Sequence, residues 1–394
     1  MVNKEMYGLG SKRSVIRELF EYGKMRAKQF GADSVFDFSI GNPSVAAPDC
    51  VDETIKELVN TVESTVLHGY SSAQGDIDAR TAVANSLNNK HGAEYSADNI
   101  YMTCGAAAGL AITLRALCEE GDEFVIIAPY FPEYTVFIKA AGGTVVTVPF
   151  AENFQIDISA LRSAISPCTK AVIVNSPNNP SGVVYSNETL SSLAKVLVDG
   201  EKKYGHSIYV IADEPYRELV YGGTQAPFIP SLYANTIICN SFSKSLSLPG
   251  ERIGYIAVNP HAGGADDVYT AIMGAGRALG YVCAPVLFQR VVAKCIDALP
   301  RIEQYAENRD LLYGELTKIG YECVHPDGAF YLFVKALGGS SAEFSERAKK
   351  YGLLLVPGDD FAAEGWMRIA YCVDKEMIKK SIPYFQALYD SYLN

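Results

Sequence analysis

The sequence predicts an α/β fold, in which a large domain with a mainly parallel seven-stranded sheet flanked by helices accompanies a smaller α+β domain. Three observations support this prediction. The 394 residues are enough for roughly two or three domains with buried cores. Short apolar runs alternate with helix-like segments through the middle of the chain. The two chain ends lack this alternation, so they are expected to form a separate, smaller unit.

The strands are expected in the middle of the chain, where seven apolar runs have the length of buried strands. The runs are 99–103, 123–128, 144–148, 171–175, 208–212, 236–240 and 253–258. Because helix-like segments separate many of them, the strands are expected to be mainly parallel and covered on both faces. In such sheets a ligand binds beyond the carboxyl ends of the strands.

Three helices are expected between these strands. Residues 106–118 are rich in alanine and leucine, and residues 134–141 form a shorter helical segment. Residues 187–198 carry leucines at helical spacing, and Ser186 or Asn187 provides a suitable N-cap.

The chain ends have a different character. A long helix is expected over residues 14–30, and the C-terminal part combines long helices with short strands near 330–334 and 367–373. We therefore predict a large domain over residues 46–284 and a small domain built from residues 1–45 and 285–394.

Composition and charge argue against several classes of protein. Lys and Arg number 34 against 45 Asp and Glu, and the net charge of −11 disfavours binding to nucleic acids and anionic membranes. The nine cysteines form no C-x-x-C pair and the five histidines lack H-x-x-x-H spacing, so no metal site is expected. The first residues lack the apolar segment of a secretion signal. A cytoplasmic protein with reduced thiols is expected.

Polar residues follow two of the expected strands where each strand ends. Asp213-Glu214-Pro215-Tyr216 follows the run 208–212, and Ser241-Phe242-Ser243-Lys244 follows the run 236–240, with Arg252 eight residues further on. Taken singly, Asp213 is a helix cap, Lys244 a solvated lysine and Arg252 a surface charge. Their joint placement at one edge of the sheet favours a ligand site.

The motifs of the chain, in order, resemble those of class I/II aminotransferases, fold type I enzymes that use pyridoxal 5′-phosphate (PLP). The resemblance runs from Ile40-Gly41-Asn42-Pro43 to Arg368 and is most specific in 241–244 together with 249–255. It implies that Lys244 forms a Schiff base with PLP and then moves a proton between the substrate and the cofactor.

The resemblance also identifies residues that hold the cofactor ring. Asp213 corresponds to the carboxylate beside the ring nitrogen, where it keeps that nitrogen protonated. Tyr216 and Asn179 correspond to the residues that bond the ring 3′-oxygen, and Phe131 to an aromatic ring stacked on the pyridine. Core packing is the alternative role for Tyr216 and Phe131, and an ordinary loop turn is the alternative for Asn179.

The phosphate of the cofactor needs hydrogen-bond donors and positive charge. By resemblance, a helix N-terminus and three side chains supply them, and the residues are Gly105, Ala106, Ala107, Ser241, Ser243 and Arg252. Tyr70 resembles a family tyrosine that reaches the phosphate of the neighbouring subunit. The resemblance therefore implies a homodimer with shared active sites.

Substrate binding is implied at the other end of the motif series. Arg368 lies in an apolar run, where an unpaired charge is costly, and its family counterpart binds the substrate α-carboxylate. Asn179 and a backbone N–H near Gly41 assist. Arg277 lies near the position of a second family arginine, from the partner chain, that binds a distal carboxylate. Other cations that remain open for this role are Lys12, Arg13 and Arg17.

The resemblance implies an aminotransferase that moves an amino group from an L-amino acid to a 2-oxoacid, with an aspartate/2-oxoglutarate type as one option. A PLP-dependent carbon–sulfur β-lyase on the same scaffold is an alternative, because fold does not fix the reaction. A PLP-sensing effector domain of a transcription regulator is a remote alternative. Only about forty residues precede Gly41, too few for a DNA-binding module, and the chain is acidic.

Overall fold

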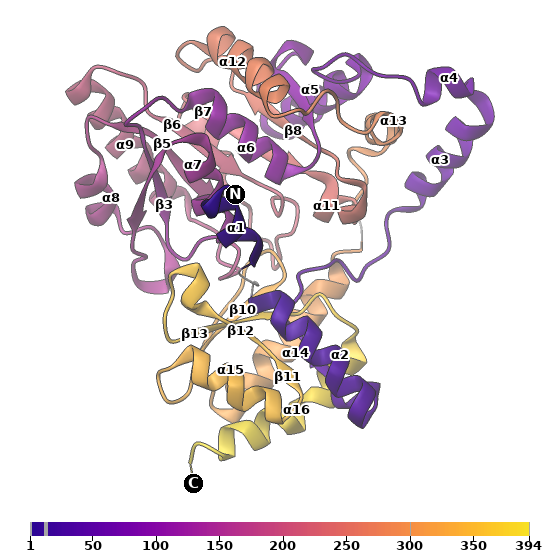
Figure 1. The fold of residues 1–394 in the computed structure, drawn as a ribbon, viewed down its shortest axis with the longest axis vertical. Helices are drawn as coiled ribbons and strands as arrows, with labels where there is room; N and C mark the ends of the chain where they lie inside the picture. Colours follow the sequence, from indigo (N-terminus) through magenta and orange to yellow (C-terminus); the bar gives the residue numbers. More distant parts are fainter. Residues whose placement is uncertain (1, 12–14, 300, 394) are drawn as a thin grey trace.

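The computed structural model of the protein describes residues 2–11, 15–299 and 301–393. Figure 1 shows two parts along the long axis, a larger one that contains a seven-stranded sheet and a smaller one below it that ends at the C-terminus.

The larger part is built on a sheet with the strand order β2-β8-β7-β6-β5-β3-β4. The strands are β2 (Ile100–Thr103), β3 (Glu123–Ile127), β4 (Thr144–Val148), β5 (Thr169–Asn175), β6 (Tyr209–Asp213), β7 (Thr236–Ser241) and β8 (Gly254–Val258). β8 is antiparallel to β2 and β7, whereas all other neighbouring strands are parallel. The prediction of a mainly parallel seven-stranded sheet is confirmed.

Helices cover both faces of this sheet. Alternate side chains of each strand point to opposite faces, and both sets are apolar and pack against helices. In β5, Val172 and Val174 belong to one hydrophobic cluster, and Ala171 and Ile173 belong to another. The first cluster includes side chains of α3 (Asp49–Thr61), α5 (Ile77–His91), α8 (Ile158–Ala164), α9 (Asn187–Tyr204), α10 (Ile229–Leu232) and α13 (Val286–Cys295). The second includes side chains of α6 (Ala106–Leu117), α7 (Glu133–Ala141) and α12 (Ala265–Ala278).

The three helices expected between strands are α6, α7 and α9, and α9 is longer than expected. Ser186 caps it, since its Oγ accepts the backbone N–H of Thr189 at 3.0 Å. The helix continues to Tyr204 and ends at Gly205, which has a φ of 80°. Its last turns carry polar residues and Gly200, which packs closely against Ile165 and Ile208. The leucines at helical spacing therefore mark only the first part of the helix, and its last turns are not visible in that pattern.

The smaller part contains a four-stranded sheet in the order β12-β13-β10-β9, with every pair antiparallel. Its strands are β9 (Cys323–Val324), β10 (Tyr331–Lys335), β12 (Val356–Pro357) and β13 (Trp366–Ala370). The helices around it are α2 (Val15–Phe30), α14 (Glu303–Ile319), α15 (Ser341–Lys350) and α16 (Lys375–Asp390). The helix expected over 14–30 is α2, and residue 14 lies outside the described residues.

The two chain ends meet in this smaller part. The short strands β1 (Phe36–Asp37) and β11 (Leu353–Leu354) pair in parallel, so a segment near the N-terminus adds to the C-terminal half. The domain boundary expected between 284 and 285 stays a prediction. Because α13 packs on α3 and α5, we propose that the larger part extends through α13.

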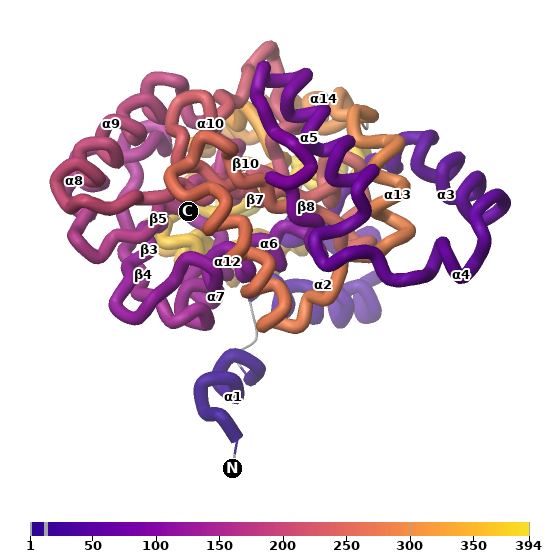
Figure 2. Tube along the Cα trace, turned by 90° about the horizontal axis from the view of Figure 1, so that it is seen from above, coloured from indigo at the N-terminus to yellow at the C-terminus, as the bar shows by residue number. Residues whose placement is uncertain are grey.

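The first helix, α1 (Lys4–Ser11), has no buried residue and stands apart from the body of the molecule in Figure 2. The short helix α4 (Ser64–Leu67) extends outward with α3 at the edge of the larger part (Figure 1). No helix in the described part of the chain combines the length and apolar character that crossing a bilayer requires.

Candidate active site

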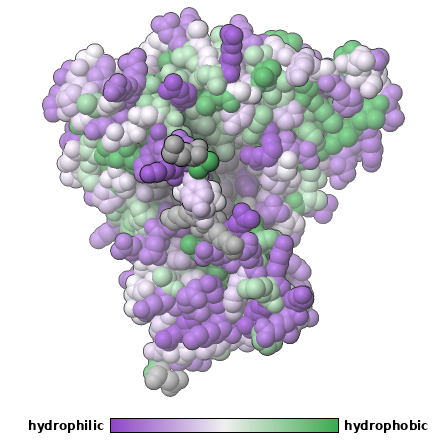
Figure 3. Space-filling view, in the orientation of Figure 1, coloured by the Kyte–Doolittle hydropathy of each residue, from purple (hydrophilic) through white to green (hydrophobic). Residues whose placement is uncertain are grey.

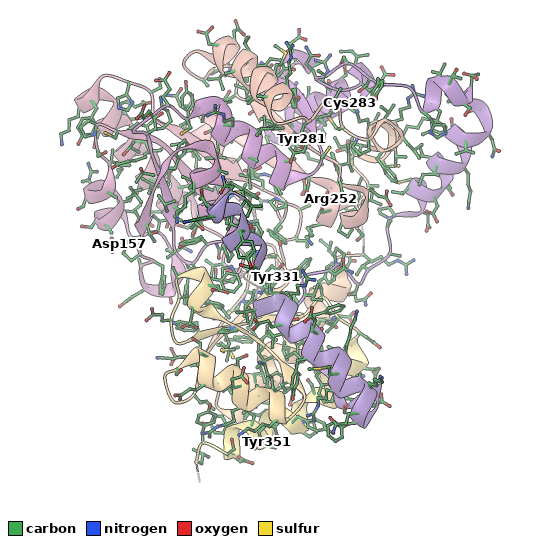
Figure 4. All side chains as sticks on the ribbon, viewed as in Figure 1. Asp157, Arg252, Tyr281, Cys283, Tyr331 and Tyr351 are labelled. Carbon is green, nitrogen blue, oxygen red and sulfur yellow. The ribbon has the colours of Figure 1, made fainter. Side chains whose placement is uncertain are left out.

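A cavity of about 330 Å³ lies at the carboxyl ends of β5, β6 and β7. Its wall comes from both parts of the molecule, and Figure 4 shows Arg252 on the upper part and Tyr331 on the lower part. The residues predicted from the sequence that line it are Gly41, Ala106, Ala107, Phe131, Asn179, Asp213, Tyr216, Ser241, Ser243, Lys244, Arg252 and Arg368. Three predicted residues do not line this cavity: Tyr70 and Arg277, which are exposed, and Gly105, which directly precedes the lining residues Ala106 and Ala107.

Lys244 lies in the short helix α11 (Phe242–Ser245), directly after β7. Its Nζ donates a hydrogen bond to the carbonyl oxygen of Gly41 at 2.7 Å and lies 5.1 Å from the centre of the Phe330 ring. Burial lowers the pKa of the Lys244 amine to about 8, and the nearby Arg368 and Arg252 also lower it. A larger fraction of the amine is therefore neutral and nucleophilic near neutral pH.

Asp213 is the last residue of β6, and it is buried. The Tyr134 hydroxyl donates to Oδ2 at 2.5 Å, whereas Oδ1 has no hydrogen-bond partner among the described residues. Burial raises the pKa of the Asp213 carboxyl to about 7, although the bond from Tyr134 lowers it. A buried acceptor without a partner is costly, so this oxygen is suited to a donor on a ligand in the cavity.

Tyr216 and Asn179 lie on the same wall. The hydroxyls of Tyr216 and Tyr331 are 3.0 Å apart, and Asn179 Oδ1 accepts a bond from Arg368 Nη1 at 3.1 Å. Asn175 fixes the neighbouring backbone, because its Oδ1 accepts the N–H of Asn179 at 2.8 Å. The same side chain donates to the backbone carbonyl of Asp213 at 2.9 Å, which joins the ends of β5 and β6.

The N-terminus of α6 faces Arg252 and the two serines. Gly105 precedes the helix with a φ of 86°, a conformation that favours glycine, and a Cβ there would lie 2.7 Å from Arg252 Nη2. Arg252 Nη1 donates to the carbonyl of Pro249 at 2.9 Å. Ser241 and Ser243 are buried on the same wall. Free backbone N–H groups, hydroxyls and a guanidinium together make an anion site.

Arg368 lies in β13 with only 3% of its surface exposed. Its Nη2 donates to the carbonyl of Ser39 at 2.6 Å, and Nε is buried without a partner among the described residues. The guanidinium lies between the rings of Tyr331 and Phe361, with centre distances of 4.7 and 5.0 Å. The two ring contacts and the hydrogen bonds of Arg368 restrict the orientation of its planar guanidinium.

Several residues of this site were missed in the sequence. Tyr134 and Tyr331 bond Asp213 and Tyr216, Ile16 of α2 lines the cavity, and the thiol of Cys372 donates to the carbonyl of Ile40 at 3.7 Å. A signal for Tyr134 did exist, because it lies three residues after Phe131 at the start of an expected helix. Tyr331 and Cys372 lie in apolar strand-like runs, where nothing in the sequence separates them from core residues.

No group of three or more His, Cys, Asp or Glu side chains in residues 2–11, 15–299 and 301–393 is placed to hold a metal ion. The reactive groups of the cavity are the amine of Lys244, the carboxyl group of Asp213, one oxygen of which has no hydrogen-bond partner among the described residues, and the guanidinium groups of Arg252 and Arg368.

A sequence model of the family of class I and II aminotransferases matches residues 33–384. The chain belongs to this family. It is 33% identical over 374 residues to a probable aspartate/prephenate aminotransferase of Thermus aquaticus. The matched region covers 92% of this chain and 94% of that relative. The crystal structure of an aminotransferase from Eubacterium rectale has a TM-score of 0.98 and 56% identity, with 100% of both chains covered. The aspartate aminotransferase of Thermus thermophilus with maleate has a TM-score of 0.86 and 26% identity, covering 98% of this chain and 99% of that one.

These relatives confirm the prediction of a PLP-dependent aminotransferase of fold type I, and they do not favour the β-lyase or the effector domain. PLP is the cofactor of this family, and the residues of the cavity fit it. The unpaired Oδ1 of Asp213 suits a protonated ring nitrogen, and the anion site at α6 suits a phosphate. The primary amine of Lys244 lines the same cavity as these two groups of residues.

Proposed function

We propose that this aminotransferase transfers the amino group of an L-amino acid to a 2-oxoacid with Lys244 as its catalytic base, Asp213 on the ring nitrogen and Arg368 on the substrate α-carboxylate. The convergence of these three side chains on one cavity carries the proposal. When bound, PLP supplies an aldehyde carbon that takes up the amino group and a ring that accepts electron density. Lys244 Nζ would hold the cofactor covalently, with loss of water, and would be released when the amine of the substrate takes its place; the freed Nζ would then move the proton of the substrate Cα.

The remaining residues of the cavity orient the cofactor. Tyr216 and Asn179 hold the ring 3′-oxygen, and Phe131 covers one face of the ring. The phosphate is held by the backbone N–H groups and side chains of Gly105, Ala106, Ala107, Ser241, Ser243 and Arg252. Arg368, with Asn179 and the backbone of Gly41, would hold the α-carboxylate and so orient the substrate Cα in the cavity.

Borohydride reduction of the purified enzyme tests the central role of Lys244. The treatment fixes the bound cofactor to its lysine, and mass spectrometry of the digested protein locates the modified residue. We expect the label on Lys244 and no stable label in the Lys244→Ala variant. A label on a different lysine, or an enzyme that transaminates without PLP, would contradict the proposal.

A homodimer with shared sites is the proposed active unit. Exposed apolar side chains lie on α3 and α4, at the start of α5 and just after α12, and Figure 3 shows hydrophobic residues over α3 and α4. They are Val59, Val66, Ile77, Leu279 and Val282. Tyr70 is 90% exposed in one chain, as expected for a residue that completes the site of a second copy.

Subunit mixing tests the shared site. Lys244→Ala and Tyr70→Ala are each expected to be weak or inactive alone, because each damages both sites of its dimer. Mixed dimers contain one site with both native residues, so activity is expected to return after the two variants are unfolded and refolded together. Unchanged inactivity in a mixture shown by mass to contain mixed dimers would contradict the shared site.

The amino donor is proposed to be of the aspartate type, because relatives bear that name and the Thermus thermophilus enzyme was solved with maleate, a dicarboxylate. Arg277, exposed at the end of α12, is proposed to meet the distal carboxylate across the subunit boundary. Lys12 and Arg13 lie outside the described residues, and Arg17 bonds Glu21 at 3.4 Å on α2. If aspartate and glutamate react no faster in wild type than in Arg277→Ala, Arg277 has no such role. A cytoplasmic location and a part in amino acid biosynthesis stay predictions.

A further inference from the structure

The turn that carries Asp213 and Tyr216 has two faces. Asp213, Pro215 and Tyr216 line the active-site cavity, whereas Glu214 and Arg217 do not. Arg217 instead lines a separate small cavity behind the turn, together with Glu218 and Tyr255. The cofactor-facing side chains are therefore displayed by a turn whose opposite face is held by other residues.

Glu214 and Arg217 form a bidentate ion pair on that opposite face. Arg217 Nε donates to Glu214 Oε2 at 2.7 Å, and Nη2 donates to Oε1 at 3.0 Å. The side chains are 1% and 8% exposed, and no other ion pair recorded among the described residues has both partners below 10%. Solvent therefore competes little with this pair, and its geometry is restricted to the fork-on-carboxylate arrangement.

Arg217 also ties the turn to a second segment of the chain. Its Nη1 donates to the carbonyl of Ala226 at 3.1 Å and Nη2 to the carbonyl of Pro227 at 3.0 Å. The guanidinium carbon lies 5.2 Å from the centre of the Phe228 ring, which is stacked on His91. Four hydrogen bonds and one ring contact thus fix the position of Arg217 relative to the large part of the molecule.

We propose that Arg217, through its ion pair with Glu214, is a positioning residue for transamination that holds Asp213 and Tyr216 against the cofactor ring. The pair joins the residue after Asp213 to the residue after Tyr216, so it fixes the distance between the two cofactor-facing side chains. The inference rests on the proposed roles of Asp213 and Tyr216. Its consequence falls first on cofactor affinity, since Arg217 itself touches neither cofactor nor substrate.

Four variants separate positioning from simple stabilisation. Arg217→Met leaves the buried Glu214 without a partner, and the double variant Glu214→Gln/Arg217→Met removes both charges. Arg217→Lys keeps the charge but loses the fork. Lys318→Met is the matched control, because Lys318 pairs with Glu315 at the same i,i+3 spacing but is 73% exposed. Each protein is measured for its Tm and for its dissociation constant for PLP, the latter from quenching of protein fluorescence.

Arg217→Met is expected to lower the Tm and to weaken PLP binding by at least about tenfold. The double variant is expected to recover most of the Tm, because exchange of a buried ion pair for neutral groups is often tolerated, and yet to remain at least about tenfold weaker for PLP. The PLP affinity of Arg217→Lys is expected to lie between that of wild type and that of Arg217→Met. The PLP affinity of Lys318→Met is expected to equal that of wild type.

Wild-type PLP affinity in the double variant, or in Arg217→Lys should the double variant not fold, would overturn the proposal and leave the pair as a structural element only. Asp213→Asn is measured beside them. If Asp213→Asn binds PLP like wild type, the proposed role of Asp213 is wrong. If it weakens PLP binding whereas the Arg217 variants do not, only the positioning role is wrong.

Discussion

Replacing Asp213 with asparagine is expected to stabilise the cofactor-free protein at neutral pH and to weaken its hold on PLP. The buried carboxyl group has a bond from Tyr134 on Oδ2 and no partner on Oδ1. Its ionised form is therefore poorly solvated in the folded protein. Asparagine has nearly the same shape, keeps an acceptor for Tyr134 and carries no charge to bury.

The magnitude follows from the pKa of Asp213, which is about 7 in the folded protein against 3.8 for the free side chain. Below pH 3.8 the carboxyl is protonated in both states and contributes no pH dependence. As the pH rises from 3.8 to 7, the unfolded chain releases the proton while the folded protein keeps it, so the free energy of unfolding falls. The fall is about 1.4 kcal/mol per pH unit and reaches about 4 kcal/mol above pH 7.

Urea unfolding measures the effect. It is carried out on the cofactor-free wild type and on Asp213→Asn at a series of pH values between 4 and 8, which spans this window. The difference in unfolding free energy is expected to grow with pH up to about pH 7 and then to level off. Asp33→Asn controls for the loss of one negative charge, because the side chain of Asp33 is 96% exposed. A difference between wild type and Asp213→Asn that does not vary with pH would refute the reasoning.

Three other changes test the ends of the site. Arg368→Lys replaces a fork by a point charge, so the KM for the amino donor is expected to rise at least about tenfold in steady-state assays while PLP affinity changes little. Gly105→Ala places a Cβ 2.7 Å from Arg252 Nη2 at a φ of 86°, and titration is expected to show weaker binding of PLP but not of pyridoxal, which lacks the phosphate. Tyr134→Phe removes the bond that lowers the pKa of Asp213, so PLP affinity is expected to decline with acid at a higher pH than in wild type. If the dependence of PLP affinity on pH is the same in Tyr134→Phe as in wild type, Tyr134 does not influence the pKa of Asp213.

The sequence predicted the parts of the site that follow from chain order. Asp213 comes directly after one apolar run, and Lys244 ends the short polar segment 241–244 that follows another. Because the carboxyl ends of parallel strands meet at one edge of a sheet, their approach needed no knowledge of packing. The anion site near Gly105 followed in the same way from a strand, a glycine and an alanine-rich helix.

The missed residues depend on packing between elements far apart in the sequence. Tyr134 bonds Asp213 across 79 positions, and that contact exists only because α7 lies with its first turn over the end of β6. Tyr331 meets Tyr216 across 115 positions and from the other part of the molecule. Tyr70 and Arg277 are the opposite case. The sequence predicted roles for them, but those roles require a second chain, so one chain alone cannot test them. The helix α9 is longer than expected because its last turns carry polar residues and Gly200 in place of the spaced leucines that mark its first part.

The bond from Arg368 to Ser39 joins positions 329 residues apart, and it has a consequence for how the protein is made. At about 5–20 residues per second, a ribosome adds Arg368 roughly 15 to 65 seconds after Ser39. All seven strands of the large sheet are complete in the chain by Val258, well before that moment. Nascent chains can therefore assemble the sheet that carries Asp213 first, whereas the bond between Arg368 and Ser39 forms only when translation is nearly finished. A chain that stops short of β13 lacks Arg368, the residue proposed to bind the substrate carboxylate, however well its sheet has folded.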